Sequence, residues 1–429
     1  MDIAICLITY NRINSLKRLL SSLDNAMYPC PVKLYISVDK SNESTVEEFA
    51  EEYQWRYGEK EVILHEENLG LRKHVLSCGD LLQKHDALVM LEDDIYVAPG
   101  FMLFAQAAVK EFTGRKEIAG ISLYSFFINY HSCQPFIPIK ENSDVYLMQN
   151  AQSWGQVWMK EQWNAFKVWY DENCEAFGSM PHLPKSICGW SNKSWLKYHT
   201  RYCIENNKYF VYPYTSYTTC FSDVGEHIKD STPIVQTPLS LATEVRLSFC
   251  PTVKYDSYFE NQKIYEWIGM SVDELCIDYY GDNGNQMKRR FWLSRLLMPF
   301  KKVKTFGLLL RPYELNIKYS IPGEDLFLYD TEEAAEINFS PEYHNRQYFY
   351  LYGTSYVDTK PLEWETDRLK NLVSTHEQTI SSQEQIISSQ EQMIYSKRRQ
   401  IKHWKNRTII ISVIFLIFII SVSLTFVLS

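Results

Sequence analysis

The sequence predicts an α/β fold in which a mainly parallel sheet carries helices on both faces. Two observations predict it. Short apolar runs alternate with helix-period patterns through the first 125 residues, and several of the apolar runs end in polar side chains. Such alternation favours a parallel sheet, because a crossover helix must join strands that run in the same direction. A third observation, a repetitive segment followed by an uncharged one, sets the C-terminal region apart.

Five apolar runs mark the expected strands, which cover residues 3–8, 34–38, 62–64, 87–91 and 118–123. Three helices are expected between or after these strands, because apolar residues recur at helical spacing. Their apolar faces are Leu16, Leu19, Leu20 and Leu23; Leu71, Val75, Cys78 and Leu82; and Phe104, Ala108 and Phe112. Asn14 is the predicted N-cap of the first helix, and Pro99 suits the first turn of the third.

The rest of the chain divides by composition. A first domain is predicted over residues 1–235, and its second half is rich in Tyr, Trp, Ser and Asn. Residues 236–355 are expected to form an extension packed on that domain, with an acidic helix pattern at 332–336.

A helical stalk is predicted over residues 363–404. Val373, Ile380, Ile387, Ile394 and Ile401 recur every seven residues, as in one seam of a coiled coil. The partner positions of that seam are polar, namely His376, Gln383 and Gln390. A weak coiled coil that joins copies of the chain and a single solvated helix therefore both stay open.

Residues 408–428 carry no charge and are long enough to span a bilayer. Six cations precede them, at Lys397, Arg398, Arg399, Lys402, Lys405 and Arg407. By the positive-inside rule the sequence predicts a single-pass membrane protein with a C-terminal transmembrane helix and a cytoplasmic N-terminal domain. The alternative is a buried core helix, which would not need a cationic collar. The apolar run at residues 3–8 is too short to span a membrane and lacks the basic flank of a signal peptide.

Composition excludes several partners. The chain carries 52 acidic and 44 basic residues, a net charge of −8, so it lacks the basic field of a nucleic-acid-binding protein. Ten cysteines are scattered without a CxxC pair, which favours reduced thiols over a zinc site or a disulfide framework.

The clearest chemical signal is the acidic triplet Glu92-Asp93-Asp94, directly after the apolar run 87–91. Three adjacent carboxylates repel one another unless a cation compensates them. Ligands of open α/β sheets bind beyond the carboxyl ends of the strands. The triplet therefore predicts a site for a hard divalent ion, Mn²⁺ or Mg²⁺.

Three more loops follow expected strands. Thr9 to Arg12 open the first helix and suit an anionic group, since a helix N-terminus and an arginine both attract one. Asp39 follows the second strand and can accept hydrogen bonds from a base or a ribose. Residues 65–73 follow the third strand and include two cations. Because successive parallel strands end at one edge of a sheet, these loops are expected to share one site.

The motifs in this order resemble the nucleotide-sugar glycosyltransferases of the GT-A (Rossmann-like) fold. They are more narrowly similar to the N-acetylglucosaminyltransferase I-like group, whose Glu-Asp-Asp motif is followed by a hydrophobic residue, Val-Ala-Pro and a Phe. This chain has the triplet, then Ile95, Tyr96, Val97-Ala98-Pro99, Gly100 and Phe101. Residues 153–158 resemble the acceptor-side Gly-Trp segment of that group. The resemblance covers about residues 1–235.

The resemblance implies a role for each matching residue. Arg12 and Asp39 would hold the phosphate and uracil sides of the nucleotide, Glu92 and Asp93 would contact ribose and sugar, and Asp94 would bind the metal. The group's base carboxylate lies in a Trp-acid-acid-Trp segment, but here Trp190 to Trp195 contain no carboxylate. Glu226 is the favoured substitute, with Asp223 and Asp230 as alternatives.

These features predict a metal-dependent transferase that moves a hexosyl or N-acetylhexosaminyl group from a UDP-sugar to a glycan or lipid-linked acceptor during surface polysaccharide assembly. Two alternatives remain open. A nucleotidyltransferase shares a similar sheet and metal site, but it usually has a Gly-rich loop where Thr9 to Arg12 stand. A non-catalytic membrane scaffold that binds nucleotide-sugars would keep the fold without a base.

Overall fold

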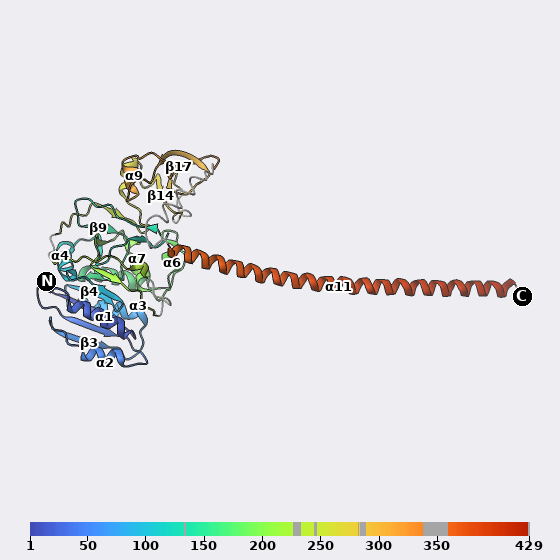
Figure 1. Cartoon of the computed structure of the whole chain (residues 1–429), viewed down its shortest axis with the longest axis horizontal. Coiled ribbons are helices and arrows are strands. Elements are labelled where there is room, and N and C mark those ends of the chain that lie inside the picture. Colours follow the sequence, from blue (N-terminus) through green and yellow to red (C-terminus); the bar gives the residue numbers. More distant parts are fainter. Residues whose placement is uncertain are drawn as a thin grey trace. The chain divides into compact units, whose positions relative to one another are not determined.

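The computed structural model describes residues 1–132, 134–225, 233–243, 247–281, 283, 289–337 and 359–427; within the last range the side chains of 359–364, 367, 418 and 421–427 are not described. The chain divides into two compact units, Met1–Asp358 and Thr359–Ser429. The first unit holds the sheets and almost all helices, and the second is one helix (Figure 1).

A nine-stranded sheet organises the first unit, in the order β13-β9-β11-β6-β10-β4-β1-β2-β3. Its strands are β1 (Ile3–Thr9), β2 (Leu34–Val38), β3 (Lys60–Leu64), β4 (Ala87–Glu92), β6 (Ile118–Ser122), β9 (Val145–Met148), β10 (Gln156–Met159), β11 (Tyr209–Pro213) and β13 (Lys254–Tyr255). The strands β3, β2, β1 and β4 are parallel neighbours, while β10 runs antiparallel between β4 and β6. The α/β fold with a mostly parallel sheet is confirmed.

Helices cover both faces of this sheet, because side chains alternate across each strand. In β1, Ile5 and Leu7 pack in one core and Cys6 and Ile8 in the other. The first core takes α1 (Ile13–Asp24), α2 (Thr45–Glu52) and α4 (Phe101–Phe112). The second core takes α3 (Gly70–Gly79), α5 (Lys160–Asn173) and α7 (Trp195–Glu205). The remaining short elements of this part are η1 (Asp80–Gln83), β5 (Ile95–Val97), β7 (Ile128–Asn129), β8 (Gln134–Pro135), α6 (Lys185–Gly189), β12 (Thr218–Cys220) and η2 (Pro233–Val235).

The three predicted helices are present, but the start of the first differs. Its N-cap is Arg12, without a side-chain capping bond, and Asn14 lies inside the helix. The prediction of Asn14 as the cap was wrong because the helix begins as soon as β1 ends. The helix α2 was not predicted: it has eight residues, and only Val46 and Ala50 are buried.

A second, four-stranded sheet follows, in the order β14-β15-β17-β16. Its elements are β14 (Leu275–Ile277), β15 (Phe291–Ser294), β16 (Phe300–Phe306) and β17 (Leu326–Ala334), with the helices α8 (Lys263–Ile268) and α9 (Glu314–Lys318). A third core, which includes Ile264, Leu293 and Leu328, fills this subdomain. The helix pattern expected at 332–336 was wrong, because residues up to Ala334 continue β17, which pairs with both β15 and β16. Residues 338–355 of the predicted extension lie outside the described residues.

The second unit is the single helix α11 (Thr359–Val427), which includes the predicted stalk. The side chains of Ile380, Ile387, Ile394 and Ile401 are exposed along it. Within the part of the chain that is described, no helix is long and apolar enough to cross a membrane. The predicted membrane span at 408–428 lies partly outside that part, because the side chains of 418 and 421–428 are not described.

Candidate active site

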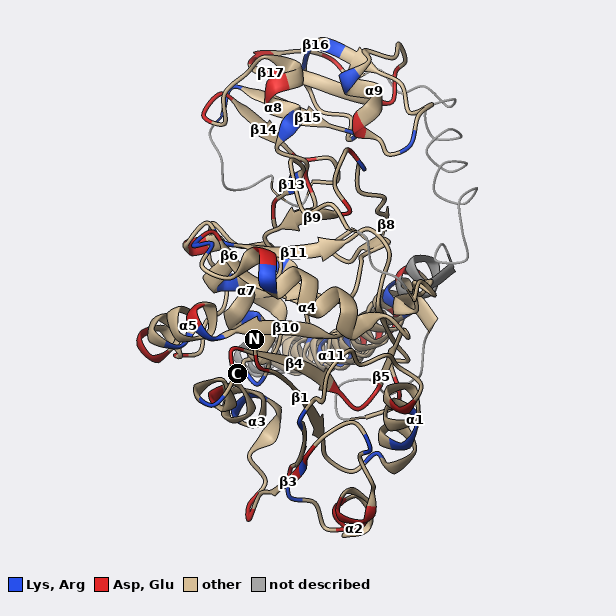
Figure 2. Ribbon diagram, turned by 90° about the vertical axis from the view of Figure 1, so that its left-hand side faces the viewer, with Lys and Arg blue, Asp and Glu red and all other residues tan. Residues whose placement is uncertain are grey.

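A cavity of about 340 Å³ opens at the carboxyl edge of the large sheet. Side chains from the loops after β1, β2 and β4 and from the first turns of α3 line it together, as the sequence predicts. The lining consists of Ile8, Thr9, Tyr10, Asn11, Arg12, Asp39, Asn68, Gly70, Leu71, His74, Glu92, Asp93, Asp94, Trp154, Lys193, Cys220, Asp223 and Gly225. The acidic link between β4 and β5 is red in Figure 2.

The register of the sheet explains this convergence. Thr9 pairs with Val38 of β2, and Ile8 pairs with Glu92 of β4, so the three strands end at one level. A polar residue just beyond that level can avoid the apolar core and face the cavity. The strand β12 then pairs with β5, and the N–H of Phe221 donates to the carbonyl of Asp94 at 2.9 Å, which brings the segment after β12 against the same site.

Arg12 is the cation that compensates the acidic triplet. Its guanidinium forms an ion pair with Asp93, and its Nη1 lies 3.3 Å from Asp94 Oδ2. Asp93 also accepts a hydrogen bond from Thr9 Oγ1 at 2.8 Å. Burial alone would lower the pKa of Arg12, but the neighbouring Asp93 and Asp94 raise it above its ordinary value. The predicted phosphate-binding cation therefore lies against Asp94, the predicted metal ligand, and against Asp93, predicted to contact the sugar.

The first two carboxylates of the triplet hold protons more strongly than usual. Burial, and next the charge of Asp94, raise the pKa of Glu92 to about 8. Burial raises the pKa of Asp93 to about 6, although Arg12 opposes that shift. Glu92 lies 3.4 Å from Trp195 Nε1, which donates to it from the first turn of α7. Burying several carboxyl groups side by side costs folding free energy. Carboxyl groups with raised pKa values in a cavity are therefore typical of a functional site.

Asp39 stabilises the start of α3 at the carboxyl edge of the large sheet. Its Oδ1 accepts a hydrogen bond from the N–H of Leu69 at 2.8 Å, and its Oδ2 accepts one from the N–H of Gly70 at 3.0 Å. These bonds cap the start of α3, whose own N-cap residue makes no side-chain bond. Asp39 is buried and lines the cavity.

Asp223 lies in the cavity wall but is held by a cation. It forms an ion pair with Arg18 and accepts a 2.6 Å hydrogen bond from Ser15 Oγ. Burial tends to raise the pKa of Asp223, but the bonds from Arg18 and Ser15 outweigh it and lower the pKa below the usual value. Such a carboxylate is a weak base. Glu226, the favoured base, and Asp230 lie outside the described residues.

The cavity contains three side chains to which the sequence assigned no site role or only a general one. His74 is buried and its Nε2 lies 2.7 Å from Ser37 Oγ, which joins the wall to β2. Lys193 occupies the segment where the resembled group has its base, so the departure noted in the sequence was the available signal. Trp154 lines the cavity as a candidate sugar-stacking ring, whereas Trp158 is buried and stacks on Trp163 at 4.3 Å, in the core.

The carboxylates of the cavity fit a divalent cation that arrives with a phosphate. Among the described residues, no group of three His, Cys, Asp or Glu side chains is arranged to hold a metal ion. Mg²⁺, however, is usually held by one or two carboxylates together with waters and substrate phosphates. Asp93 and Asp94 both line the cavity, and they are hard oxygen ligands of that kind.

Comparisons with known proteins find a family that part of the chain resembles. Residues 4–155 match the model of glycosyl transferase family 2. No match was found among curated proteins. Solved structures to which the chain has some similarity include S. aureus TarS 1-349 in complex with UDP-GlcNAc, at 16% identity and a TM-score of 0.32, over 53% of this chain and 60% of that one. Another is the mannosyltransferase PcManGT from Pyrobaculum calidifontis in complex with GDP-Man and Mn²⁺, at 13% identity and a TM-score of 0.27, over 37% of this chain and 44% of that one.

Similarity this low to solved structures supports no statement about substrates, and the chain spans only about 60% of the length of TarS 1-349. The family match is independent of these structures and covers the strands and loops from β1 to the segment before β10, including Arg12, Asp39 and the acidic triplet. Residues 4–155 are therefore similar to glycosyl transferase family 2.

Proposed function

We propose that the chain transfers a sugar from a UDP-sugar to a hydroxyl group of a glycan or lipid-linked acceptor, with the help of Mn²⁺ or Mg²⁺. The observation that carries this proposal is the single cavity in which Arg12, Asp39 and the acidic triplet meet at the carboxyl ends of parallel strands. Nucleotide ligands of open α/β sheets bind at this edge.

The donor would change the internal ion pairs of the cavity. A diphosphate would offer Arg12 an anion that competes with Asp93 and Asp94, and the contact with Asp94, at 3.3 Å, is the longer of the two. Asp39, fixed by the N–H groups of Leu69 and Gly70, would accept a hydrogen bond from the base or the ribose.

Asp94, with Asp93, would hold the divalent cation. The cation supplies neutralisation of the negative charge that develops on the departing diphosphate. The carboxylates must be ionised to bind it, and the pKa of about 6 for Asp93 puts that condition within reach at neutral pH. Cation binding would therefore weaken below pH 6, where Asp93 takes up a proton.

An acceptor hydroxyl must lose a proton as it attacks the anomeric carbon. The ion pair of Asp223 with Arg18 favours a structural role for Asp223. We therefore keep Glu226 as the proposed base, and the variant Glu226→Gln tests it. An inverting outcome depends on this base and stays a prediction.

Membrane attachment is part of the proposal and rests on the sequence alone. Residues 408–428 are uncharged and follow six cations, which favours a C-terminal anchor with the catalytic domain on the cytoplasmic side and a lipid-linked or surface glycan as acceptor. The exposed isoleucines of α11 suit association of copies of the chain through the stalk. Membrane fractionation of the full chain, with and without residues 405–429, tests the anchor.

The experiment that tests the transfer is a donor screen. The full chain is incubated with UDP-, GDP-, dTDP- and CMP-sugars and Mn²⁺, with and without EDTA, beside Asp94→Asn. We expect release of UDP from one donor, lost with EDTA and in the variant. Binding of UDP without turnover of any donor would favour a scaffold, and release of pyrophosphate from a sugar phosphate and UTP would favour a nucleotidyltransferase.

A further inference from the structure

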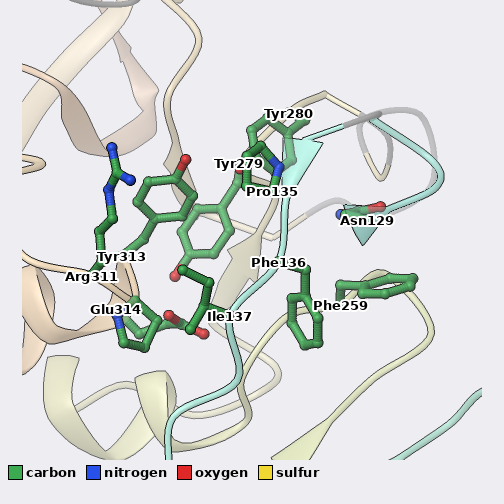
Figure 3. A pocket seen from close by; sticks show the side chains of 11 residues that line it. Asn129, Pro135, Phe136, Ile137, Phe259, Tyr279, Tyr280, Arg311, Tyr313 and Glu314 are labelled. Carbon is green, nitrogen blue, oxygen red and sulfur yellow. The ribbon is translucent and has the colours of Figure 1, made fainter. Parts of the chain in front are cut away.

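A second cavity lies away from the donor site, between the large sheet and the four-stranded subdomain. Its walls come from the β7–β8 hairpin on one side and from α9 and the segment after β14 on the other (Figure 3). The lining consists of Asn129, Pro135, Phe136, Ile137, Phe259, Tyr279, Tyr280, Arg311, Pro312, Tyr313 and Glu314. Its enclosed volume is about 30 Å³, which is room for a hydroxyl or hydroxymethyl group with little to spare.

Two polar groups face this space. The hydroxyl of Tyr279 is buried and has no hydrogen-bond partner in the described part of the chain. Glu314 is also buried, and its Oε1 accepts a hydrogen bond from the hydroxyl of Tyr255 at 3.0 Å. In Figure 3 the hydroxyl end of Tyr279 and the carboxyl group of Glu314 point toward the same space.

The unpartnered hydroxyl needs an explanation. A buried polar group without a hydrogen bond costs about 1–3 kcal/mol, and native proteins rarely keep one without a reason. Burial also raises the pKa of Glu314 to about 7, so its carboxyl group exists in both protonation states near neutral pH. The pair therefore offers a hydroxyl that can donate beside a carboxyl that can accept or donate.

Apart from Asn129 and Arg311, the rest of the lining is aromatic and apolar. Phe136 and Phe259 pack edge to face, with ring centroids 4.9 Å apart. Tyr280 and Tyr313 are half-buried. Ile137 is 49% exposed. Flat rings with a few convergent polar groups are typical of a small-ligand site, and a pyranose ring matches such a surface with its C–H face and its hydroxyl groups.

We propose that this cavity is a subsite for a glycan, which inserts one hydroxyl or hydroxymethyl group between Tyr279 and Glu314 and rests its ring on Tyr280 and Tyr313. The inference rests on the proposed sugar transfer, because it identifies the acceptor as an extended glycan held away from the reacting end. The enclosed space is too small for a whole sugar ring, so the ligand enters by one edge. An occupant limited to ordered water is the competing outcome of the test.

Tyr279→Phe is the decisive variant, since it removes only the unpartnered hydroxyl and should leave stability unchanged or slightly higher. Tyr329→Phe is the matched control in the same subdomain: its hydroxyl donates to the carbonyl of Leu296 at 3.0 Å, so its loss should lower stability without affecting glycan binding. The full chain, labelled and free of nucleotide, is applied to a printed array of neutral hexose and N-acetylhexosamine oligosaccharides, and each bound glycan is then titrated.

We expect at least one array glycan to bind, with affinity at least fivefold weaker in Tyr279→Phe and unchanged in Tyr329→Phe. Absence of any bound glycan, or equal affinity in Tyr279→Phe and the native chain, would overturn the proposal and leave a water site. Donor-dependent UDP release is measured separately in the same variants and should not change. A failure of sugar transfer is thereby distinguished from a failure of the subsite.

Discussion

His199 gives the structure a predictable sensitivity to acid. Its ring is 1% exposed, and neither of its nitrogens has a hydrogen-bond partner among the described residues. It stacks on Phe166 with ring centroids 4.1 Å apart. Burial lowers the pKa of His199 from 6.5 to about 3, because no neighbour compensates a charge there.

The sign follows from linkage. At pH 8 the imidazole is neutral in both states. As the pH falls below 6.5, the unfolded chain binds a proton that the folded chain does not, so the free energy of unfolding decreases. At pH 5 the loss reaches about 2 kcal/mol, since the pH is about 1.5 units below the pKa in the unfolded chain. It continues to grow until the pH approaches 3.

His199→Phe removes the titrating group and keeps a flat ring against Phe166. Relative to the native chain, the variant should therefore gain about 2 kcal/mol of stability between pH 8 and pH 5, whatever its packing cost at pH 8. Urea unfolding curves of both proteins at the two pH values measure this difference. The raised carboxyl pKa values elsewhere in the chain increase stability as the pH falls. Both proteins share them, so their effect cancels in the comparison.

If the free energy of unfolding of the native chain and of His199→Phe fell in parallel between pH 8 and pH 5, the assignment of an acid-sensitive buried imidazole would be refuted.

Three further predictions concern packing, the acidic triplet and the base. Gly79→Ala should destabilise the chain by about 1–3 kcal/mol, because the added Cβ would lie 2.2 Å from the ring of Trp163; Gly178→Ala meets no atom within 4 Å and is the control. A melting temperature equal in both would contradict this packing. Arg12→Met should lower stability by about 3 kcal/mol at neutral pH and by less at pH 5, where the freed Asp93 takes up a proton, as thermal unfolding at both pH values would show; a constant difference would argue against the ion pairs. Glu226→Gln should reduce transfer by about 10²-fold or more while UDP binding is unchanged, and full transfer activity would exclude it as the base.

Sequence patterns were sufficient to predict the features of the structure that depend on neighbouring residues in the chain. The predicted strand 34–38 has the observed bounds of β2, because a short run that is apolar except for Ser37 suits a strand buried on both faces. The gathering of Arg12, Asp39 and the acidic triplet was also predictable, since parallel strands place their following loops at one edge. Asn14 failed as a cap because the choice between neighbouring polar residues depends on where the strand ends.

Contacts between residues far apart in the chain could not be predicted from the sequence. Residues 156–158 belong to the buried strand β10, which is inserted antiparallel between β4 and β6. Nothing local indicates that insertion. The ion pair of Arg18 with Asp223 and the contact of Arg12 with Asp93 join residues far apart in the chain, so candidate residues could be named without their mutual interactions.

The central claim is that a nucleoside diphosphate binds in the donor cavity together with a cation held by Asp94. Calorimetric titration of UDP into the full chain, with Mn²⁺ or with EDTA, tests it directly, beside Asp94→Asn. The account predicts binding that weakens at least tenfold with EDTA and becomes insensitive to Mn²⁺ in the variant. Absence of UDP binding, or equal binding under all four conditions, would contradict it.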